Sequence, residues 1–322
     1  MVKMISILVA ASVLLVGSSH ELFGQNYPDH PISLIIPLAP GDGADIAGRI
    51  MGEALASILK VPITPLNKPG AGGTVGTDFV AKGRKDGYTI LLAPSPAIIT
   101  AKILHPEDVN YDSFKDLTPL GLATVTPVVF TVKRDTPYKS LKELAEYSRQ
   151  NRGKIRCSTS GVGSSADFNI PIVKNFTGAD ITAVPFKGAS PAITALLGGH
   201  VEMAATAIAP VLDHLRSGEA RGLVTSKRLP EFPNIPTLQE LGSTQDLFGI
   251  WFAFFAPAGI PVEVKEKLVP AIEKVVKDPV IASKLERMGL IQEFLPSDRL
   301  LQDMTKEYRM SDEIAKKEGL KK

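Results

Sequence analysis

The sequence predicts an α/β protein of about two domains, and three observations support this prediction. The chain has 322 residues, a length that suits about two domains, each burying its own core. Short apolar runs alternate with longer segments of helical periodicity, which indicates largely parallel sheets covered by helices. Loops rich in Gly, Ser and Thr follow several predicted strands, at the position where open α/β sheets bind ligands.

The composition excludes several other classes of protein. Hydrophobic residues make up 44% of the chain and charged residues 22%, which is typical of a folded chain and not of a disordered one. The 36 basic and 34 acidic residues leave a net charge of +2, which offers no electrostatic basis for binding nucleic acid. The single cysteine, Cys157, excludes an intrachain disulfide and a Cys-based zinc site. It lies in a predicted strand, which favours a small buried residue over a nucleophile.

Residues 1–24 are expected to be a signal peptide. A basic start precedes an uncharged apolar run from Met4 to Val16, and small residues follow it. The run is shorter than the roughly 20 apolar residues of a transmembrane helix, although an uncleaved anchor is the alternative. Cleavage after Ser19 or Gly24 would export the mature chain.

The first third of the mature chain contains three predicted strands. Residues 32–36 and 89–93 are short, continuous apolar runs, and a weaker strand lies near Ile63. Apolar residues recur at helical spacing between Ala47 and Leu59, and a second helix passes through Val75, Phe79 and Val80.

The rest of the chain continues the same alternation of strands and helices. The predicted strands are Val128–Val132, Ile155–Thr159, Ile181–Pro185, Met203–Ala207, Gly222–Thr225 and Phe252–Ala256. The predicted helices pass through residues 141–147, 193–197, 264–275 and 300–314.

Three loops that each precede a helix are candidates for anion binding: Gly41–Asp45, Gly70–Thr74 and Ser160–Ser165. Each presents unpaired backbone N–H groups at the positive end of a helix dipole, although a tight strand-to-helix turn is the alternative interpretation. Asp42 and Asp45 are better explained as the N-cap and a first-turn acid of the following helix than as catalytic residues. Asp45 can also pair with Arg49, four residues later on that helix. Lys187 either faces an anionic ligand or is a solvated loop lysine.

Catalytic and metal-binding patterns are missing from the sequence. It has no G-x-S-x-G nucleophile elbow, no β-lactamase set built on S-x-x-K, and no H-E-x-x-H motif. The histidines of the mature chain lack metal-ligand spacing: His30, His105, His200 and His214. We therefore expect no metal, no cofactor and no enzymatic activity.

An ordered set of motifs resembles the periplasmic receptors of tripartite tricarboxylate transporters, also called Bug-type receptors. The similarity runs from Tyr27 to the C-terminus. It is carried by Tyr27-Pro28-x-x-Pro31-Ile32, Pro40-Gly41-x-Gly43-x-Asp45, Pro69-Gly70-Ala71-Gly72-Gly73, Asp86-Gly87-Tyr88-Thr89, Pro185-Phe186-Lys187-Gly188, Leu197-Gly198-Gly199-x-Val201, Pro236-Thr237 and Ala256-Pro257-Ala258-Gly259.

The resemblance implies a two-domain, Venus-flytrap fold of the type II-like class, with a cleft between two mainly parallel α/β domains. It places domain 1 at residues 26–123 plus 249–322 and domain 2 at residues 124–248, with the C-terminal helices packed on domain 1. Closure of the domains around the ligand is the expected motion.

The resemblance, together with the loop chemistry, also implies ligand-binding residues in both domains. Those of domain 1 are Leu38, Gly41, Gly43, Asp45, Gly72, Gly73, Thr74 and Ser95. Those of domain 2 are Ser160, Gly161, Gly163, Ser164, Ser165, Asp167, Lys187, Gly188 and Thr206.

Three positions depart from the family pattern and bear on the ligand. Asp42 lies where the family usually has three consecutive glycines, and it would repel an anion unless it turns outward to cap the helix. Asp167 replaces a histidine, and Thr206 replaces an acidic residue. The missing acid weakens the case for an amine-bearing ligand.

The function expected from the resemblance is that of an exported, periplasmic receptor. It would capture a small organic carboxylate, such as a dicarboxylate, a tricarboxylate or an aromatic acid, and deliver it to the membrane subunits of the transporter. One alternative is a ligand sensor that acts on a two-component sensor kinase. Another is a secreted hydrolase, which the missing catalytic motifs disfavour.

Overall fold

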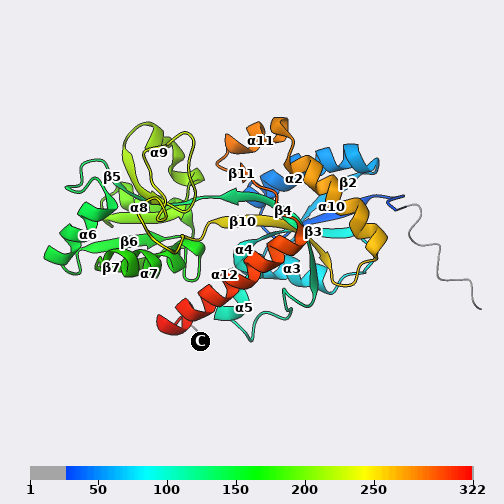
Figure 1. Cartoon of the computed structure of the whole chain (residues 1–322), viewed down its shortest axis with the longest axis horizontal. Coiled ribbons are helices and arrows are strands. Elements are labelled where there is room, and N and C mark those ends of the chain that lie inside the picture. The colour runs from blue at the N-terminus through cyan, green and yellow to red at the C-terminus, as the bar shows by residue number, and fades with distance from the viewer. Residues whose placement is uncertain (1–26, 321–322) are drawn as a thin grey trace, which may run out of the picture.

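The computed structural model describes residues 27–320 as two lobes lying side by side, each built on one β-sheet (Figure 1). The predicted signal peptide, residues 1–24, lies outside the described residues. Within residues 27–320, no helix combines the length and the apolar character that a membrane span requires.

The sheet of the first lobe is mixed, with strand order β11-β4-β10-β3-β1-β2. β1 is parallel to β2 and β3, whereas β10 runs against both of its neighbours, β3 and β4, and β11 runs against β4. The strands are β1 (Ile32–Ile36), β2 (Ile63–Asn67), β3 (Thr89–Pro94), β4 (Leu117–Thr126), β10 (Ile250–Pro257) and β11 (Ile291–Gln292).

Helices cover both faces of this sheet because alternate strand residues point to opposite sides. Leu34 packs with α2 (Gly43–Leu59), α10 (Val262–Val276) and α11 (Pro279–Glu286). Ile35 faces the other layer, which contains η1 (Ala71–Gly73), α3 (Thr74–Ala81), α4 (Ser95–Ile98), α5 (Thr100–Leu104) and α12 (Ser297–Lys317). Two of the apolar residues that mark α3 in the sequence are exposed, namely Val75 and Phe79.

The second lobe repeats this arrangement around a sheet of order β7-β6-β8-β5-β9. β6, β7 and β8 are parallel, and β5 is antiparallel to β8 and β9. The strands are β5 (Val128–Lys133), β6 (Ile155–Thr159), β7 (Ile181–Pro185), β8 (Met203–Ala207) and β9 (Ala220–Thr225).

Two helical layers also cover this second sheet. One contains α6 (Leu141–Gln150) and α7 (Ser165–Thr177), and the other contains α8 (Ala189–Leu197), η2 (Ala209–Val211) and α9 (Leu212–Arg216). Cys157 of β6 is fully buried between the sheet and the first of these layers, and burial raises the pKa of its thiol.

The chain crosses between the lobes twice. β4 ends at Thr126, Pro127 follows, and β5 begins the second sheet. The return passes through Gly249 into β10. The boundary predicted between residues 123 and 124 falls inside β4, whereas the one between residues 248 and 249 falls just before β10.

The last helix, α12, contacts both lobes, although the resemblance led us to expect the C-terminal helices on the first lobe. It packs on β4 and α5 of the first lobe and on α7 of the second (Figure 1). Ala315 belongs to a small cluster with Leu104 of α5 and Phe168 of α7. The helix is long enough to reach the second lobe because its 21 residues span about 30 Å.

Candidate functional site

A cavity of about 400 Å³ lies where the two lobes meet. The first lobe contributes the loop before α3 and the short helices α4 and α5, and the second lobe contributes the loop before α7. Of the predicted ligand-binding residues, the cavity brings together Gly72, Thr74 and Gly163. Its other lining residues are Ala71, Pro96, Thr100, Ala101, Leu104, His105, Asp108, Val109 and Val162.

Gly163 of the second lobe contacts the first lobe at this cavity. Its carbonyl oxygen accepts a hydrogen bond of 3.3 Å from the Thr100 hydroxyl of α5. Its φ is +76°, and a Cβ atom there would lie 2.0 Å from the Leu104 side chain. Only glycine allows both this backbone conformation and this contact.

Asp45 holds the first glycine loop in place. Its carboxylate accepts hydrogen bonds from the Gly41 N–H at 2.9 Å, Arg49 Nε at 2.9 Å and Asn67 Nδ2 at 3.0 Å. Burial opposes ionisation of this group, but these hydrogen bonds outweigh it and lower the pKa of Asp45. The predicted pairing with Arg49 is confirmed. Asp42 occupies the N-cap position of α2, but its side chain makes no capping hydrogen bond.

Asp167 plays the same part in the second lobe. Its carboxylate accepts the Gly163 N–H at 3.0 Å, and its own N–H donates to Ser164 Oγ at 3.2 Å, so Ser164 is the N-cap of α7. Burial raises the pKa of Asp167, while the hydrogen bond from Gly163 opposes the rise. In both lobes an aspartate at the third helical position therefore anchors a glycine four residues earlier. The prediction that these loops present unpaired backbone N–H groups is wrong for Gly41 and Gly163.

The side chains of several other predicted residues are buried. Ser95 is 1% exposed, and its hydroxyl accepts the Trp251 N–H at 3.3 Å. Thr206 is fully buried, and within residues 27–320 its hydroxyl has no hydrogen-bond partner. Ser165 is buried in the first turn of α7.

The remaining predicted residues lie in the loops at the carboxyl ends of the strands. The Leu38 carbonyl accepts a hydrogen bond from Asn67 Nδ2, and the Gly188 N–H donates one to the Ser160 carbonyl. Gly73 is the N-cap residue of α3. Gly43 is the first residue of α2 and lies against the Phe252 ring. Gly161 has a φ of +140° and lies next to the Phe186 carbonyl. The Lys187 side chain is exposed.

The part of the cavity wall between Pro96 and Val109 was not predicted from the sequence. α4 and α5 have four and five residues, too short to show a helical period, and no motif marks the loop that follows. This segment nevertheless brings His105 and Asp108, both exposed, to the cavity. Within the described part of the chain, no group of His, Cys, Asp and Glu is arranged to hold a metal ion.

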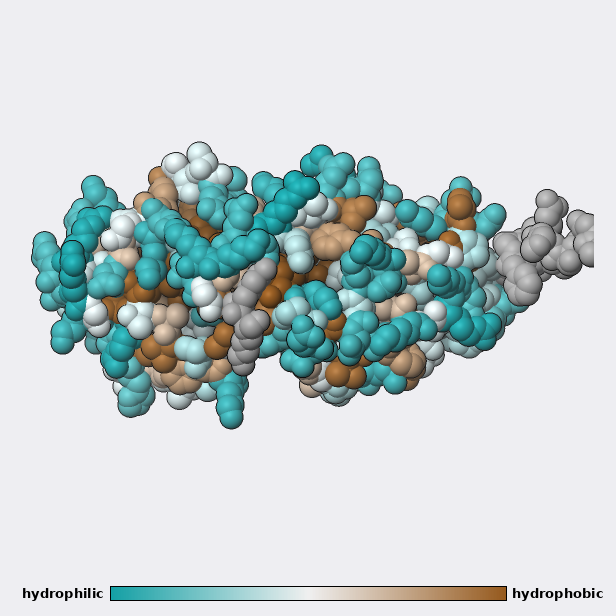
Figure 2. Space-filling model, turned by 90° about the horizontal axis from the view of Figure 1, so that it is seen from below, coloured by the Kyte–Doolittle hydropathy of each residue, from teal (hydrophilic) through white to brown (hydrophobic). Residues whose placement is uncertain are grey.

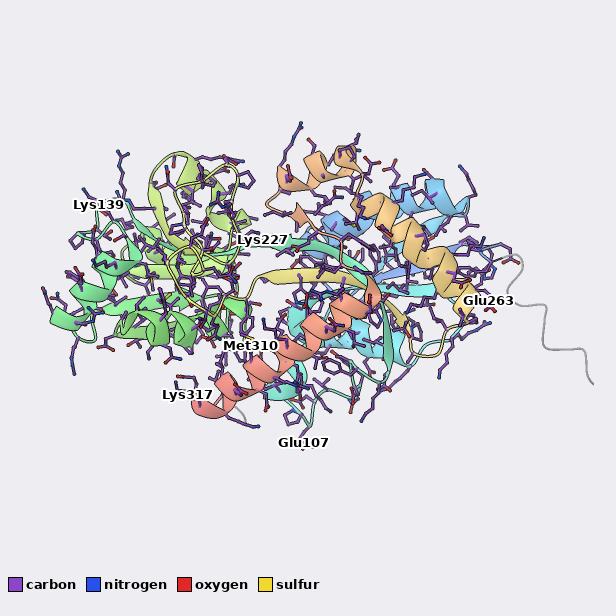
Figure 3. The ribbon with its side chains drawn as sticks, in the orientation of Figure 1. Glu107, Lys139, Lys227, Glu263, Met310 and Lys317 are labelled. Carbon is purple, nitrogen blue, oxygen red and sulfur yellow. The ribbon has the colours of Figure 1, made fainter. Side chains whose placement is uncertain are left out.

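A second cavity, of about 260 Å³, lies on the other side of the crossing strands, where α11 and β11 approach α9. Its wall includes Ile208, Leu212 and Phe232 of the second lobe and Ile291 of the first. Close to it, Lys227 of the second lobe pairs with Glu293 of the first (Figure 3). None of the predicted ligand-binding residues lines this cavity.

Comparison with known proteins places the chain in a family. The model of the tripartite tricarboxylate transporter family receptor matches residues 47–320. The chain belongs to this receptor family. BugT of Bordetella pertussis is 31% identical over 275 residues, which cover 85% of this chain and 84% of BugT. The family consists of substrate-binding receptors and not of enzymes.

Solved structures of such receptors have the same two-domain fold. A TctC solute-binding protein from Polaromonas superimposes with a TM-score of 0.79 at 27% identity, covering 91% of this chain and 100% of that one. MatC of Rhodopseudomonas palustris, solved with bound malate, superimposes with a TM-score of 0.71 at 28% identity. That match covers 89% of this chain and 99% of MatC. The receptor fold predicted from the sequence is confirmed.

Proposed function

We propose that this receptor is exported to the periplasm, captures a small organic carboxylate between its lobes and delivers it to the membrane subunits of a tripartite tricarboxylate transporter. The cavity shared by Gly72, Thr74 and Gly163 carries this proposal, because both lobes contribute backbone from loops that precede helices. The malate bound by the related MatC is a carboxylate of suitable size. The loop N–H groups and helix dipoles favour a carboxylate over a neutral ligand.

We also propose that the lobes are the moving domains, divided at Pro127 and Gly249. Each lobe has its own sheet and its own two-layered core. Closure would therefore change backbone dihedral angles only where the chain crosses between the lobes, at Pro127 and Gly249. Figure 2, seen from below, shows hydrophobic side chains at the junction of the lobes as well as in smaller patches on each lobe.

Thermal unfolding of the mature protein against a panel of carboxylates, amino acids and sugars tests the carboxylate proposal. The protein is first unfolded and refolded, to remove any ligand that was purified with it. A ligand at 100 times its Kd adds about 2.7 kcal/mol to the free energy of unfolding, which raises the Tm measurably. A rise with carboxylates supports the proposal, whereas a rise with sugars alone contradicts it.

Delivery is tested by uptake of the identified ligand into cells. Deletion of the receptor gene and deletion of the membrane-subunit genes should each abolish uptake, and expression of the receptor should restore it only in the first strain. Undiminished uptake without the membrane subunits would contradict the proposed delivery.

A further inference from the structure

The charge of the cavity between the lobes is unusual for a site that receives an anion. Its twelve lining residues include one aspartate, Asp108, and one histidine, His105, but no lysine or arginine. Backbone N–H groups of the glycine loops can hold one carboxylate without a formal positive charge. A second carboxylate on the same ligand would find no basic side chain in the wall.

Two basic side chains of the first lobe, Lys102 and Arg49, are bound within the protein. Lys102 of α5 donates to the carbonyl oxygens of Pro106 at 2.9 Å and Val109 at 2.5 Å, so that its ammonium group holds the loop after α5. Arg49 of α2 is bound to Asp45 and Asn67. Neither side chain lines the cavity.

Asp108 occupies a loop of fixed conformation. Its N–H donates to the His105 carbonyl at 3.1 Å, and the His105 N–H donates to the Ala101 carbonyl at 2.9 Å. Together with the Lys102 hydrogen bonds, these contacts hold the loop against the end of α5. Within residues 27–320 the Asp108 carboxylate has no hydrogen-bond or ion-pair partner, so that it is free to accept hydrogen bonds from a ligand.

We infer that the ligand is a small monocarboxylate whose other end donates hydrogen bonds, and that Asp108 selects this ligand against dicarboxylates. The inference rests on the proposed function and deepens it. The carboxylate of the ligand would bind at the loops that carry Gly72, Thr74 and Gly163, through N–H groups other than that of Gly163, which donates to Asp167. Its hydroxyl, amide or ammonium group would face Asp108. A dicarboxylate would place a second negative charge near the unpaired Asp108 carboxylate. Thr206 of the second lobe replaces an acidic residue of the family pattern. Asp108 supplies an acid to the site from the first lobe instead.

Matched pairs of ligands isolate this effect. Succinate and succinamate differ only in one terminal carboxylate or amide, and adipate and adipamate form a longer pair. Titration calorimetry on the refolded mature protein gives the Kd of each. We expect the amide of the better-fitting pair to bind about tenfold more tightly than its diacid, a typical effect of one like-charge contact at a partly exposed site. Equal or tighter binding of the diacid would overturn the inference.

A pair of variants assigns the preference to a residue. Asp108→Asn should reduce the preference for the amide about tenfold, by strengthening diacid binding. Glu107→Gln is the matched control: it removes the same charge from the adjacent residue, which lies at the outer edge of the molecule and not in the cavity wall (Figure 3). A preference unchanged in Asp108→Asn, or changed equally in both variants, would contradict the role of Asp108. If no carboxylate in the wider panel binds, the proposed function fails as well. If diacids bind more tightly, only the present inference fails.

Discussion

Asn169 and Phe248 exchange two hydrogen bonds across 79 positions of sequence. Asn169 Nδ2 donates to the Phe248 carbonyl at 2.8 Å, and the Phe248 N–H donates to Asn169 Oδ1 at 2.7 Å. This contact fixes the end of the second lobe to α7. Three residues later, the Trp251 N–H is bound to Ser95 of the first lobe. Between these two anchors lie Gly249, which precedes the sheet, and Ile250, the first residue of β10.

Replacement of Asn169 should therefore destabilise the protein. Asn169 is fully buried, and Asn169→Ala would leave two backbone groups of Phe248 without their partner. We expect a loss of about 2 kcal/mol in the free energy of unfolding, measured with urea. Asn175→Ala, an exposed position on the same helix, should change it by less than about 0.5 kcal/mol. Equal effects in the two variants would contradict the anchoring role.

Gly163 should be required for closure of the lobes. Gly163→Ala introduces a Cβ atom 2.0 Å from Leu104, in addition to the strain of positive φ. Gly153→Ala is the control, because its φ is +71° but nothing lies within 4 Å of the added atom. Both variants should lose about 1 kcal/mol of stability from the backbone. Only Gly163→Ala should also weaken carboxylate binding in titration calorimetry, and unchanged affinity would argue against this contact.

Two substitutions at Ser164 separate helix capping from ligand binding. Ser164→Ala removes the acceptor of the Asp167 N–H and should cost about 1 kcal/mol of stability. Ser164→Asn retains a capping oxygen but adds bulk at the loop, so we expect normal stability and a loss of carboxylate affinity. Thermal unfolding with and without ligand measures both effects. Full affinity in Ser164→Asn would remove this residue from the proposed site.

The stability of the protein should depend on the protonation of Glu307. This residue of α12 accepts the Trp251 indole N–H at 2.7 Å. Burial raises its pKa from 4.5 to about 7 against this hydrogen bond, and Asp303 adds to the rise. The folded protein therefore holds the proton more tightly than the unfolded chain does. The resulting stability is complete below about pH 4.5 and is lost as the pH rises through 7.

Glu307→Gln should remove this pH dependence, because a neutral amide can still accept the indole N–H. We expect the variant to gain about 1–2 kcal/mol over the wild type between pH 5 and pH 8, measured by urea unfolding at each pH. Glu313→Gln, at an exposed position of the same helix, should leave the profile of the wild type unchanged. If the free energy of unfolding of the variant changes with pH in the same way as that of the wild type from pH 5 to pH 8, Glu307 does not titrate in this range.

Trp251 should report ligand binding by its fluorescence. It is the one tryptophan of the chain, and it lies between Ser95 at the carboxyl end of β3 and Glu307 of α12. Helix α12, which carries Glu307, also contacts α7 of the second lobe, so movement of the lobes should change the surroundings of the indole. A carboxylate that raises the Tm should therefore also shift the emission, with Trp251→Phe as the control. Emission that stays constant at saturating ligand would show that ligand binding does not move α12 relative to Trp251.

Local patterns were sufficient to predict most strands and helices. The apolar run at Ile32–Ile36 and the helical spacing from Ala47 to Leu59 each appear as predicted, as β1 and α2. β4, α4, α5, α9, α11 and β11 were missed because they are short or lack a clear period, and β4 contains both glycine and proline.

The sequence by itself determined the receptor family, the α/β class and the pairing of Asp45 with Arg49, since each depends on residues close together in the chain or on the order of motifs along it. Only the tertiary structure decided which residues share the cavity, because Gly72, Asp108 and Gly163 lie on separate elements that come together when the two lobes pack. It also decided that α12 contacts both lobes. Contacts between distant segments depend on side-chain packing in three dimensions, which the periodicity of one segment does not encode.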